Sequence, residues 1–166
     1  MFRAVQNRPM IDLRHAPEPV LTQALALNAA VQHWTSPLDL PRLQALLGWA
    51  AAAPAQVSEG RLDGFLLGFG PGSAYDSPNY RWFAARLERF AYIDRVIVAP
   101  HAQGAGLARQ LYDAFAKAQP GPLVAEVNSQ PPNPGSDAFH ARLGFAEMGR
   151  ADLGPGKAVR YLIRAA

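Results

Sequence analysis

Apolar and polar positions follow the most regular pattern at residues 92–118, past the middle of the chain. A β-branched run at residues 96–98 predicts a buried strand. The strand is expected to end near Pro100, because proline cannot donate a hydrogen bond to a sheet. Apolar residues then recur at every fourth position from Leu107 to Phe115, which is helical spacing. This stretch is therefore predicted to form a strand, a tight turn and an amphipathic helix.

The rest of the chain divides into similar segments, with no internal repeat and no domain linker. Strands are expected at residues 10–14, 52–59, 64–69, 123–127, 145–150 and 157–163. Helices are expected at residues 17–35, from the N-cap Asp39 to Trp49, at residues 79–89, and at residues 137–143 after the N-cap Ser136. A hairpin connection is expected at residues 60–63. With 166 residues, the chain is predicted to be one domain, residues 1–166, in the order β-α-α-β-β-β-α-β-α-β-β.

The turn between the central strand and its helix predicts an anion site. Its sequence is Gln-Gly-Ala-Gly-Leu-Ala at residues 103–108, and these mostly small side chains allow several backbone N–H groups to converge at the helix start. Unpaired N–H groups and the helix dipole both favour negative charge there. A phosphate-bearing ligand is therefore expected at this turn.

The same turn carries a family resemblance. Gln103-x-x-Gly106-x-Ala108 resembles the Q/R-x-x-G-x-G/A signature of the GCN5-related N-acetyltransferase (GNAT) superfamily, whose loop holds the pyrophosphate of acetyl-CoA. On this resemblance, acetyl-CoA is the expected co-substrate, and no metal is expected. The residues then expected to hold the pyrophosphate are Gln103, Gly104, Ala105, Gly106, Leu107, Ala108 and Arg109.

A second match lies downstream, with the same order and spacing as in the family. Glu126-Val127, Asn133 and residues 139–145 resemble the E-V…N…A-x-x-Y-x-x-x-G-F block. The resemblance covers residues 65–163 well and the first half of the chain in outline. It implies an α/β GNAT fold, in which a mixed, mostly antiparallel sheet of six to seven strands has helices on both faces.

The resemblance also implies further cofactor contacts. In the family, the central strand separates from the next one, and pantetheine pairs with its backbone, here with Val96, Ile97 and Val98. A backbone N–H near Val98 is expected to stabilise the developing oxyanion. Asn133 stands where relatives have an asparagine that contacts the cofactor, while an ordinary turn role in its proline-rich loop is an equal alternative.

Two other ligand classes compete for the glycine turn. A dinucleotide fold would use Gly104-x-Gly106 with Glu126 downstream. However, Arg109 occupies the third glycine position, and the turn lies past mid-chain, which leaves too few residues for a six-strand sheet. A P-loop is excluded because no Gly-Lys-Ser/Thr follows. A non-catalytic acyl-CoA-binding or regulatory module on the same fold stays open, since function resides in the site.

Proton-transfer groups are assigned from the same resemblance. Glu126 occupies a position that supplies the base in some relatives, although a strand glutamate can also face solvent. Asp94 on the central strand is the alternative base, or else a partner for an arginine such as Arg95. His140 replaces the tyrosine that protonates the departing CoA thiolate in most relatives, and it either takes that role or packs against Phe145.

The acceptor pocket is expected to be covered by residues 75–89, which are rich in aromatic residues and arginine. The candidate contacts are Tyr80, Arg81, Trp82 and Arg86. The alternative is an amphipathic helix with aromatic residues in the core and arginines in solvent. The expected acceptor is a primary amine of a small molecule, and a carboxylate-bearing amine if Arg81 or Arg86 faces the cleft.

Composition and charge exclude several other classes. The chain has no cysteine, which excludes disulfides and thiolate metal sites, and its net charge of +3 comes from scattered arginines, which argues against a nucleic-acid partner. No membrane partner is expected, because the weakly polar stretch at residues 43–57 falls short of a span. Residues 1–9 lack the apolar core of a signal peptide, so a cytoplasmic location is expected. A homodimer through the hairpin at residues 145–163 is also predicted.

Overall fold

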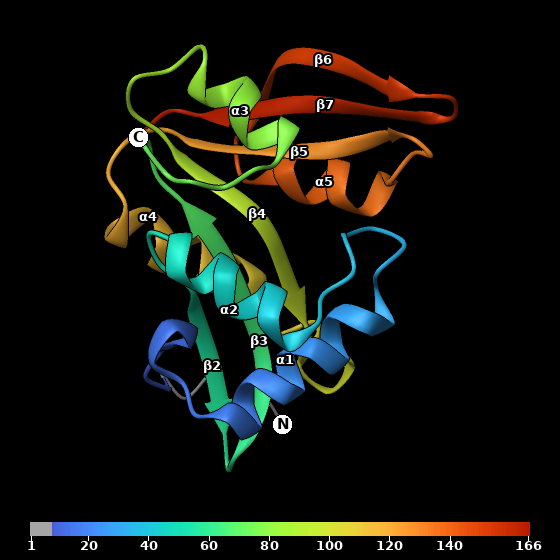
Figure 1. Ribbon diagram of the computed structural model, residues 1–166. Helices are drawn as coiled ribbons and strands as arrows, with labels where there is room; N and C mark the ends of the chain where they lie inside the picture. Colours follow the sequence, from blue (N-terminus) through green and yellow to red (C-terminus); the bar gives the residue numbers. More distant parts are fainter. Residues whose placement is uncertain (1–7) are drawn as a thin grey trace.

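The computed structural model describes residues 8–166 (Figure 1). The absence of a signal peptide was predicted from residues 1–9, and residues 1–7 of that segment lie outside the described part. The strands are β1 (Ile11–Asp12), β2 (Pro54–Ser58), β3 (Arg61–Phe69), β4 (Ala91–Val98), β5 (Leu123–Gln130), β6 (Ala146–Gly154) and β7 (Lys157–Arg164). The α-helices are α1 (Glu18–Ala30), α2 (Leu40–Trp49), α3 (Pro78–Ala84), α4 (Leu107–Ala118) and α5 (Pro134–Arg142), and the single 3₁₀ turns are η1 (Leu13–His15) and η2 (Pro100–Ala102).

The strands form one seven-stranded sheet in the order β1-β2-β3-β4-β5-β7-β6. Every neighbouring pair is antiparallel except β4 and β5, which are parallel. Parallel strands need a crossover connection, and α4 supplies it, because its apolar positions pack Leu111 and Phe115 against the sheet. The mixed, mostly antiparallel sheet expected from the sequence is confirmed.

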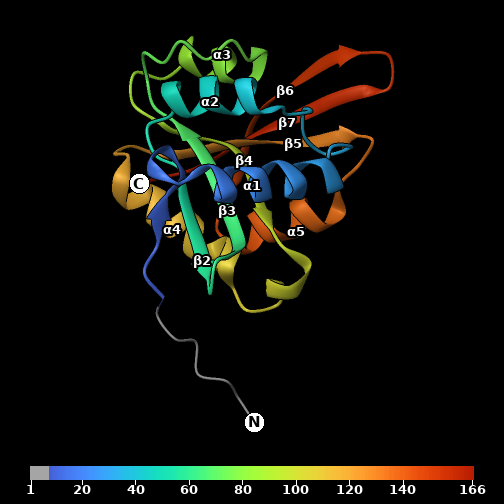
Figure 2. The ribbon, with the colours of Figure 1, turned by 60° about the horizontal axis from the view of Figure 1, so that its bottom comes forward.

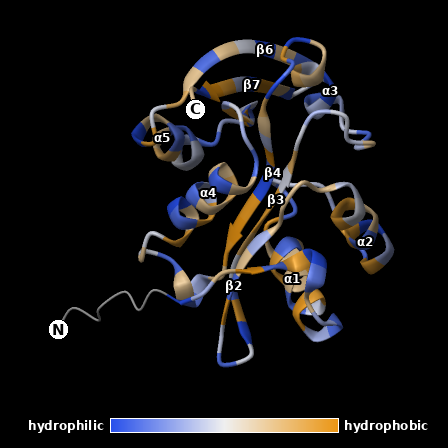
Figure 3. Cartoon of the chain, turned by 90° about the vertical axis from the view of Figure 1, so that its left-hand side faces the viewer, coloured by the Kyte–Doolittle hydropathy of each residue, from blue (hydrophilic) through white to orange (hydrophobic). Residues whose placement is uncertain are grey.

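Helices cover both faces of this sheet, as Figures 2 and 3 show. Helices α1, α2 and α3 lie on one face, where Leu21, Leu43 and Phe83 join the larger core cluster. Helices α4 and α5 lie on the other face, over a second cluster that includes Leu111. Within residues 8–166, no helix has the length and apolarity needed to cross a membrane.

The central feature of the sheet is the separation of β4 from β5. The two strands pair only where Ala91–Ile93 meet Leu123–Ala125, and no pairing continues beyond. Figure 1 shows the two ribbons diverging from that point. Each strand stays paired on its other side, β4 with β3 and β5 with β7, so the gap is held open by regular structure.

The register of β3 and β4 determines which backbone groups of β4 face this gap. Ala99 N donates to Asp63 O at 2.8 Å, and hydrogen-bonded and non-hydrogen-bonded pairs alternate along antiparallel strands. The backbone groups of Ile97 therefore point toward β3, whereas those of Val96 and Val98 point into the gap. The expectation that all three residues offer main-chain groups to the cofactor is wrong for Ile97, whose side chain is also buried in the core.

Several predicted boundaries were displaced. The connection of β2 and β3 is a two-residue turn at Glu59 and Gly60, both with positive φ (52° and 76°), which is the combination that suits a hairpin; β3 then begins at Arg61. Asn133, not Ser136, caps α5, and its side chain accepts a hydrogen bond from Ser136 N at 3.3 Å. Helix α3 ends at Ala84, five residues before the predicted end.

The hairpin of β6 and β7 has a more polar outer strand than the sequence pattern suggested. Strand β6 is the edge of the sheet, and Glu147, Arg150 and Asp152 lie along it. Charged residues on an edge strand oppose pairing with another chain. The homodimer stays a prediction.

Candidate active site

A cavity of about 790 Å³ passes through the gap between β4 and β5. From the face of α1–α3 it is lined by the loop at residues 32–37, by residues 75–79 and by Glu126 of β5. From the opposite face it is lined by Tyr112 of α4 and His140 of α5. Groups bound on the two faces of the sheet can therefore meet inside this cavity.

Glu126 is the most perturbed carboxyl group of the cavity. Tyr92 donates its hydroxyl to Glu126 Oε1 at 3.0 Å, while Oε2 is buried and has no hydrogen-bond partner within residues 8–166. Burial, and then the nearby Asp94 carboxylate, raise the pKa of Glu126 to about 8, although hydrogen bonding from Tyr92, from the Glu126 backbone and from the neighbouring Asn79 side chain partly opposes this. A carboxyl group with that pKa can accept a proton near neutral pH.

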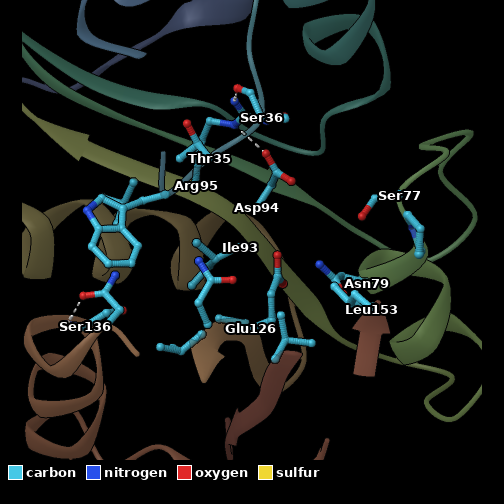
Figure 4. Close-up of a pocket in the computed structure, with 18 of the residues that line it drawn as sticks. Thr35, Ser36, Ser77, Asn79, Ile93, Asp94, Arg95, Glu126, Ser136 and Leu153 are labelled. Atoms are coloured by element: carbon cyan, nitrogen blue, oxygen red, sulfur yellow. Dashed lines mark hydrogen bonds and ion pairs between the residues drawn. The ribbon is translucent and has the colours of Figure 1, made fainter. Parts of the chain in front are cut away.

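Asp94, the alternative base, is held by two partners. Its carboxylate accepts a hydrogen bond from the Tyr75 hydroxyl at 2.6 Å and forms an ion pair with Arg95 Nε at 2.6 Å. Figure 4 shows the side chains of Asp94 and Glu126 projecting into the same cavity. Because both oxygens of Asp94 already accept strong hydrogen bonds, Glu126 is the better placed of the two to take a proton.

Arg95 connects this carboxylate to the loop between α1 and α2. It is 5% exposed, and its guanidinium donates to Asn28 Oδ1 at 2.8 Å, to Ser36 O at 3.1 Å and to Ser36 Oγ at 2.9 Å. Asn28 also donates to Ser36 O at 3.0 Å. These bonds fix the loop that forms one wall of the cavity.

His140 is buried beside the cavity, and both of its ring nitrogens have partners. Nδ1 lies 2.8 Å from Ser136 O, which can only accept, so Nδ1 carries the proton. Nε2 lies 2.8 Å from the Tyr112 hydroxyl, which donates to it. Burial lowers the pKa of His140, so the ring is neutral near pH 7, and it raises the pKa of Tyr112. This arrangement counts against the expected role of His140 as the acid, because its one proton is donated to a carbonyl.

The glycine turn exposes its backbone N–H groups at the start of α4. Gly104 and Gly106 have positive φ (81° and 77°), and a side chain added at either would meet open space. The N–H groups of residues 104–109 find no acceptor in the part of the chain that the structure describes. Arg109 is exposed next to them, and Gln103 Nε2 donates to Val98 O at 3.3 Å, which ties the turn to β4. These groups fit a pyrophosphate.

The remaining members of the predicted pyrophosphate loop contribute through the backbone. Ala105 is exposed, whereas Leu107 is buried in the core cluster under α4 and anchors the helix start. Ala108 is half-buried. Asn133 lines the cavity and also caps α5. Its side-chain oxygen accepts the capping hydrogen bond, so its side-chain nitrogen stays available to contact a cofactor.

The predicted acceptor residues lie outside the cavity. Tyr80 is buried and donates its hydroxyl to Gly70 O at 2.8 Å. Trp82 stacks on Tyr161, and Arg86 covers the outer face of Trp82, 3.9 Å from the ring centroid. Arg81 is exposed.

The acceptor-side lining comes from two segments. Residues 75–79, the first part of the predicted segment 75–89, supply Tyr75 and Asn79. The loop at residues 32–37, which the sequence patterns did not single out, supplies Trp34. Because neither Arg81 nor Arg86 reaches the cavity, the condition for a carboxylate-bearing acceptor is not met.

Comparisons with known proteins agree with this fold. The sequence matches the Acetyltransferase (GNAT) family over residues 24–145. A search of curated proteins finds no significant match.

Solved structures with this fold include several acetyltransferases. The ribosomal-protein-alanine N-acetyltransferase from Brucella melitensis is 22% identical, with a TM-score of 0.65 over 95% of this chain and 99% of that one. Ard1 from Thermoplasma volcanium is 14% identical, with a TM-score of 0.69 over 95% and 96%. YncA, a putative acetyltransferase from Salmonella typhimurium solved with its cofactor acetyl-CoA, is 19% identical, with a TM-score of 0.63 over 96% and 94%. At these identities the likeness establishes the fold.

A mixed sheet that opens beside a glycine turn, with a carboxyl group in the opening, is the arrangement expected of an acyl-CoA-dependent transferase. The chain belongs to the Acetyltransferase (GNAT) family, because the family match covers most of its length. It is an acetyl-CoA-dependent N-acetyltransferase, and its acceptor is the open question.

Proposed function

We propose that the chain transfers an acetyl group from acetyl-CoA to a primary amine of a small molecule, by direct attack within a ternary complex. The observation that carries the proposal is the single cavity through the gap of the sheet. It joins the face of α4 and α5, next to the glycine turn, with the face on which Glu126 and residues 75–79 lie. Direct transfer needs both substrates bound at once with the reacting atoms in contact.

In this proposal Glu126 takes the proton from the acceptor. A protonated amine has no lone pair for attack, so a base must remove its proton, directly or through water. Among the described residues 8–166, none forms a hydrogen bond with the buried Oε2 of Glu126, and an ammonium group placed there would donate one. A pKa of about 8 brings the carboxylate closer to the amine in proton affinity than an ordinary glutamate would be.

The glycine turn and β4 would position acetyl-CoA, which supplies the activated acetyl group as a thioester. The N–H groups at residues 104–109, together with Arg109, would bind the pyrophosphate. The backbone groups of Val96 and Val98 face the gap and would pair with the pantetheine amides. An N–H from either residue would also stabilise negative charge on the carbonyl oxygen.

The departing CoA thiolate needs little help. A thiol with a pKa of about 8.5 is a fair leaving group near neutral pH. His140 is neutral and donates its proton to Ser136 O, so we assign to it the positioning of Tyr112 in the cavity wall. Solvent then protonates the thiolate.

The experiment that tests the function is an acetylation assay with a panel of primary amines, with CoA release followed as free thiol. Purified protein that releases CoA and forms the acetylated amine supports the proposal. The turn and the gap alone would also suit a non-catalytic acyl-CoA-binding module, which the family match argues against. Tight binding of acetyl-CoA without turnover of any amine would favour that module.

A further inference from the structure

Two exposed apolar side chains at the cavity have no structural role in the core. The large apolar residues exposed within residues 8–166 are Ile11, Trp34 and Leu153, at 38%, 39% and 43%. Trp34 and Leu153 both line the cavity, and Ile11 does not. Trp34 comes from the loop between α1 and α2, and Leu153 from the end of β6, so elements far apart in the sequence present apolar surface to one opening.

The loop that carries Trp34 is fixed before any ligand binds. Ser36, two residues later, is held by the Arg95 guanidinium at 2.9 and 3.1 Å and by the Asn28 amide at 3.0 Å. Thr35 Oγ1 also donates to Asn28 Oδ1 at 3.2 Å. Figure 4 shows Thr35, Ser36 and Arg95 on one side of the cavity. An aromatic side chain on a fixed loop loses little conformational entropy when a ligand packs against it.

The arginines of the cavity are not available to bind an anion. Within residues 8–166, the lining arginine and lysine residues are Arg42, Arg95 and Lys157. Arg42 is paired with Asp76 at 2.6 Å, and Arg95 with Asp94 at 2.6 Å. Of these three residues, Lys157 alone forms no ion pair with a carboxylate that lines the cavity.

Lys157 lies too far from Glu126 to serve the same small group. Glu126 is in register with Tyr161 of β7, and Lys157 precedes Tyr161 by four residues on that strand. This separation is about 13 Å along the strand. A carboxylate on the carbon next to the amine, only two bonds from the nitrogen, would therefore lie beside Glu126 and Asp94, where the nearby lining cation, Arg95, is already paired with Asp94.

Resting on the function proposed above, we infer that the acceptor is a primary amine whose neighbouring carbon bears no carboxylate and whose body is apolar. The ammonium group binds at Glu126 Oε2, and the apolar body packs against Trp34 and Leu153. Free α-amino acids are rejected, because their carboxylate would lie beside two other carboxyl groups, Glu126 and Asp94, with no unpaired cation near enough among the described residues to bind it. Apolar contact with Trp34 and Leu153 then adds to the acceptor affinity that the hydrogen bond to Glu126 provides.

The test is a calorimetric titration of protein saturated with CoA, using probes that share one benzyl group. Phenethylamine has no carboxylate, phenylalanine carries one beside the amine, and phenylalaninamide replaces it with a neutral amide. Phenethylamine is expected to bind at least tenfold more tightly than phenylalanine. Equal or tighter binding of phenylalanine overturns the inference, as does a tenfold preference for phenylalaninamide over phenethylamine, which would indicate recognition of an amide.

Variants locate the apolar contact. Trp34→Ala and Leu153→Ala are each expected to weaken phenethylamine binding by about tenfold, the effect of losing a well-packed apolar side chain. Ile11→Ala is the matched control, because it removes an equally exposed apolar side chain outside the cavity, and it should leave binding unchanged. Unchanged binding in both cavity variants, or a complete lack of phenethylamine binding to the wild-type protein, also overturns the inference.

Acetyl transfer is measured with the same probes and with the hydrophilic amine spermidine. Transfer to spermidine or phenylalanine but not to phenethylamine would overturn the inferred acceptor class while the proposed function stood. Tight binding of phenethylamine without any acetyl transfer would overturn the proposed function while the binding preference stood. The two failures are therefore distinguishable.

Discussion

The Tyr92 hydroxyl donates to Glu126 Oε1 at 3.0 Å, while Glu126 Oε2 is buried and has no hydrogen-bond partner in the part of the chain that the structure describes. One oxygen is thus oriented by the protein, and the other is left for a ligand. A buried acceptor without a partner is costly, so such a group is expected where a substrate completes the hydrogen bonding. The pair makes the catalytic proposal testable at both residues.

Glu126→Gln is expected to lower turnover by roughly a hundredfold or more, because glutamine cannot accept the proton. In the wild-type enzyme, kcat/KM should rise with pH through the Glu126 pKa of about 8, because the base works only when deprotonated. The variant should lose this rise. Glu88→Gln, which changes an exposed carboxylate, is the control and should keep the wild-type pH profile. Wild-type turnover of Glu126→Gln across the alkaline range would transfer the role to Asp94 or to water.

Tyr92→Phe is expected to move the rise of kcat/KM to higher pH, because the lost hydrogen bond favours the charged carboxylate and lowers the pKa of Glu126. Turnover well above that pKa should fall only modestly, since Glu126 itself remains. A pH–rate profile in parallel with Tyr80→Phe measures the shift, because Tyr80 is a buried tyrosine whose hydroxyl bonds to Gly70 O outside the cavity. An identical profile for the two variants would show that Tyr92 does not act on the base.

Glu126→Gln should also stabilise the protein at alkaline pH. The pKa of Glu126 is about 8 in the folded state, against an ordinary 4.5, so the folded state binds the proton more tightly. Its stability therefore falls as pH rises between these values, while the variant is spared this loss. Above pH 8 the variant should be more stable by roughly 5 kcal/mol, and below pH 4 the two should agree. Urea denaturation at both pH values measures the difference, and a destabilised variant at alkaline pH would mean that burial does not raise this pKa.

Much of the fold could be predicted, because its elements are encoded locally. The helical spacing of Leu107, Leu111 and Phe115 defines α4, and the glycine turn before it was recognised from its small side chains. The direction of Ile97 could not be predicted, since it depends on the register of β4 against β3, which is a tertiary property.

The acceptor side of the site was harder to predict for a related reason. Trp82 and Arg86 looked like pocket residues because aromatic and arginine side chains often bind ligands, yet in this fold they stack on each other outside the cavity. The cavity is completed by Trp34 and by residues 75–79, which local patterns do not connect with Glu126. Only the folded sheet brings these segments together.

Gly106→Ala is expected to raise the KM for acetyl-CoA by roughly tenfold, equivalent to about 1.4 kcal/mol of lost binding. Gly106 precedes α4 with a φ of 77°, and an alanine there would strain the turn and place a methyl group among the free N–H groups. Gly60→Ala is a closely matched control, with a φ of 76° and equally open space around the added side chain, but in the hairpin of β2 and β3. Both variants should lose similar stability in thermal denaturation. Only Gly106→Ala should change the KM, and equal KM values would place the pyrophosphate elsewhere.

His140→Phe is expected to lower turnover by less than tenfold, far below the effect of losing a required acid. The ring is neutral, its Nδ1 proton is donated to Ser136 O, and Nε2 accepts from the buried Tyr112 hydroxyl, so it has no proton ready for the leaving thiolate. The variant leaves the Tyr112 hydroxyl without its partner, and a modest loss of stability should follow. Tyr112→Phe removes the donor of the same hydrogen bond, and its losses of turnover and stability should be close to those of His140→Phe. Steady-state assays with acetyl-CoA, repeated with a more acidic acyl thiol as leaving group, separate the two roles. A hundredfold loss in His140→Phe that the better leaving group restores would identify His140 as the acid after all.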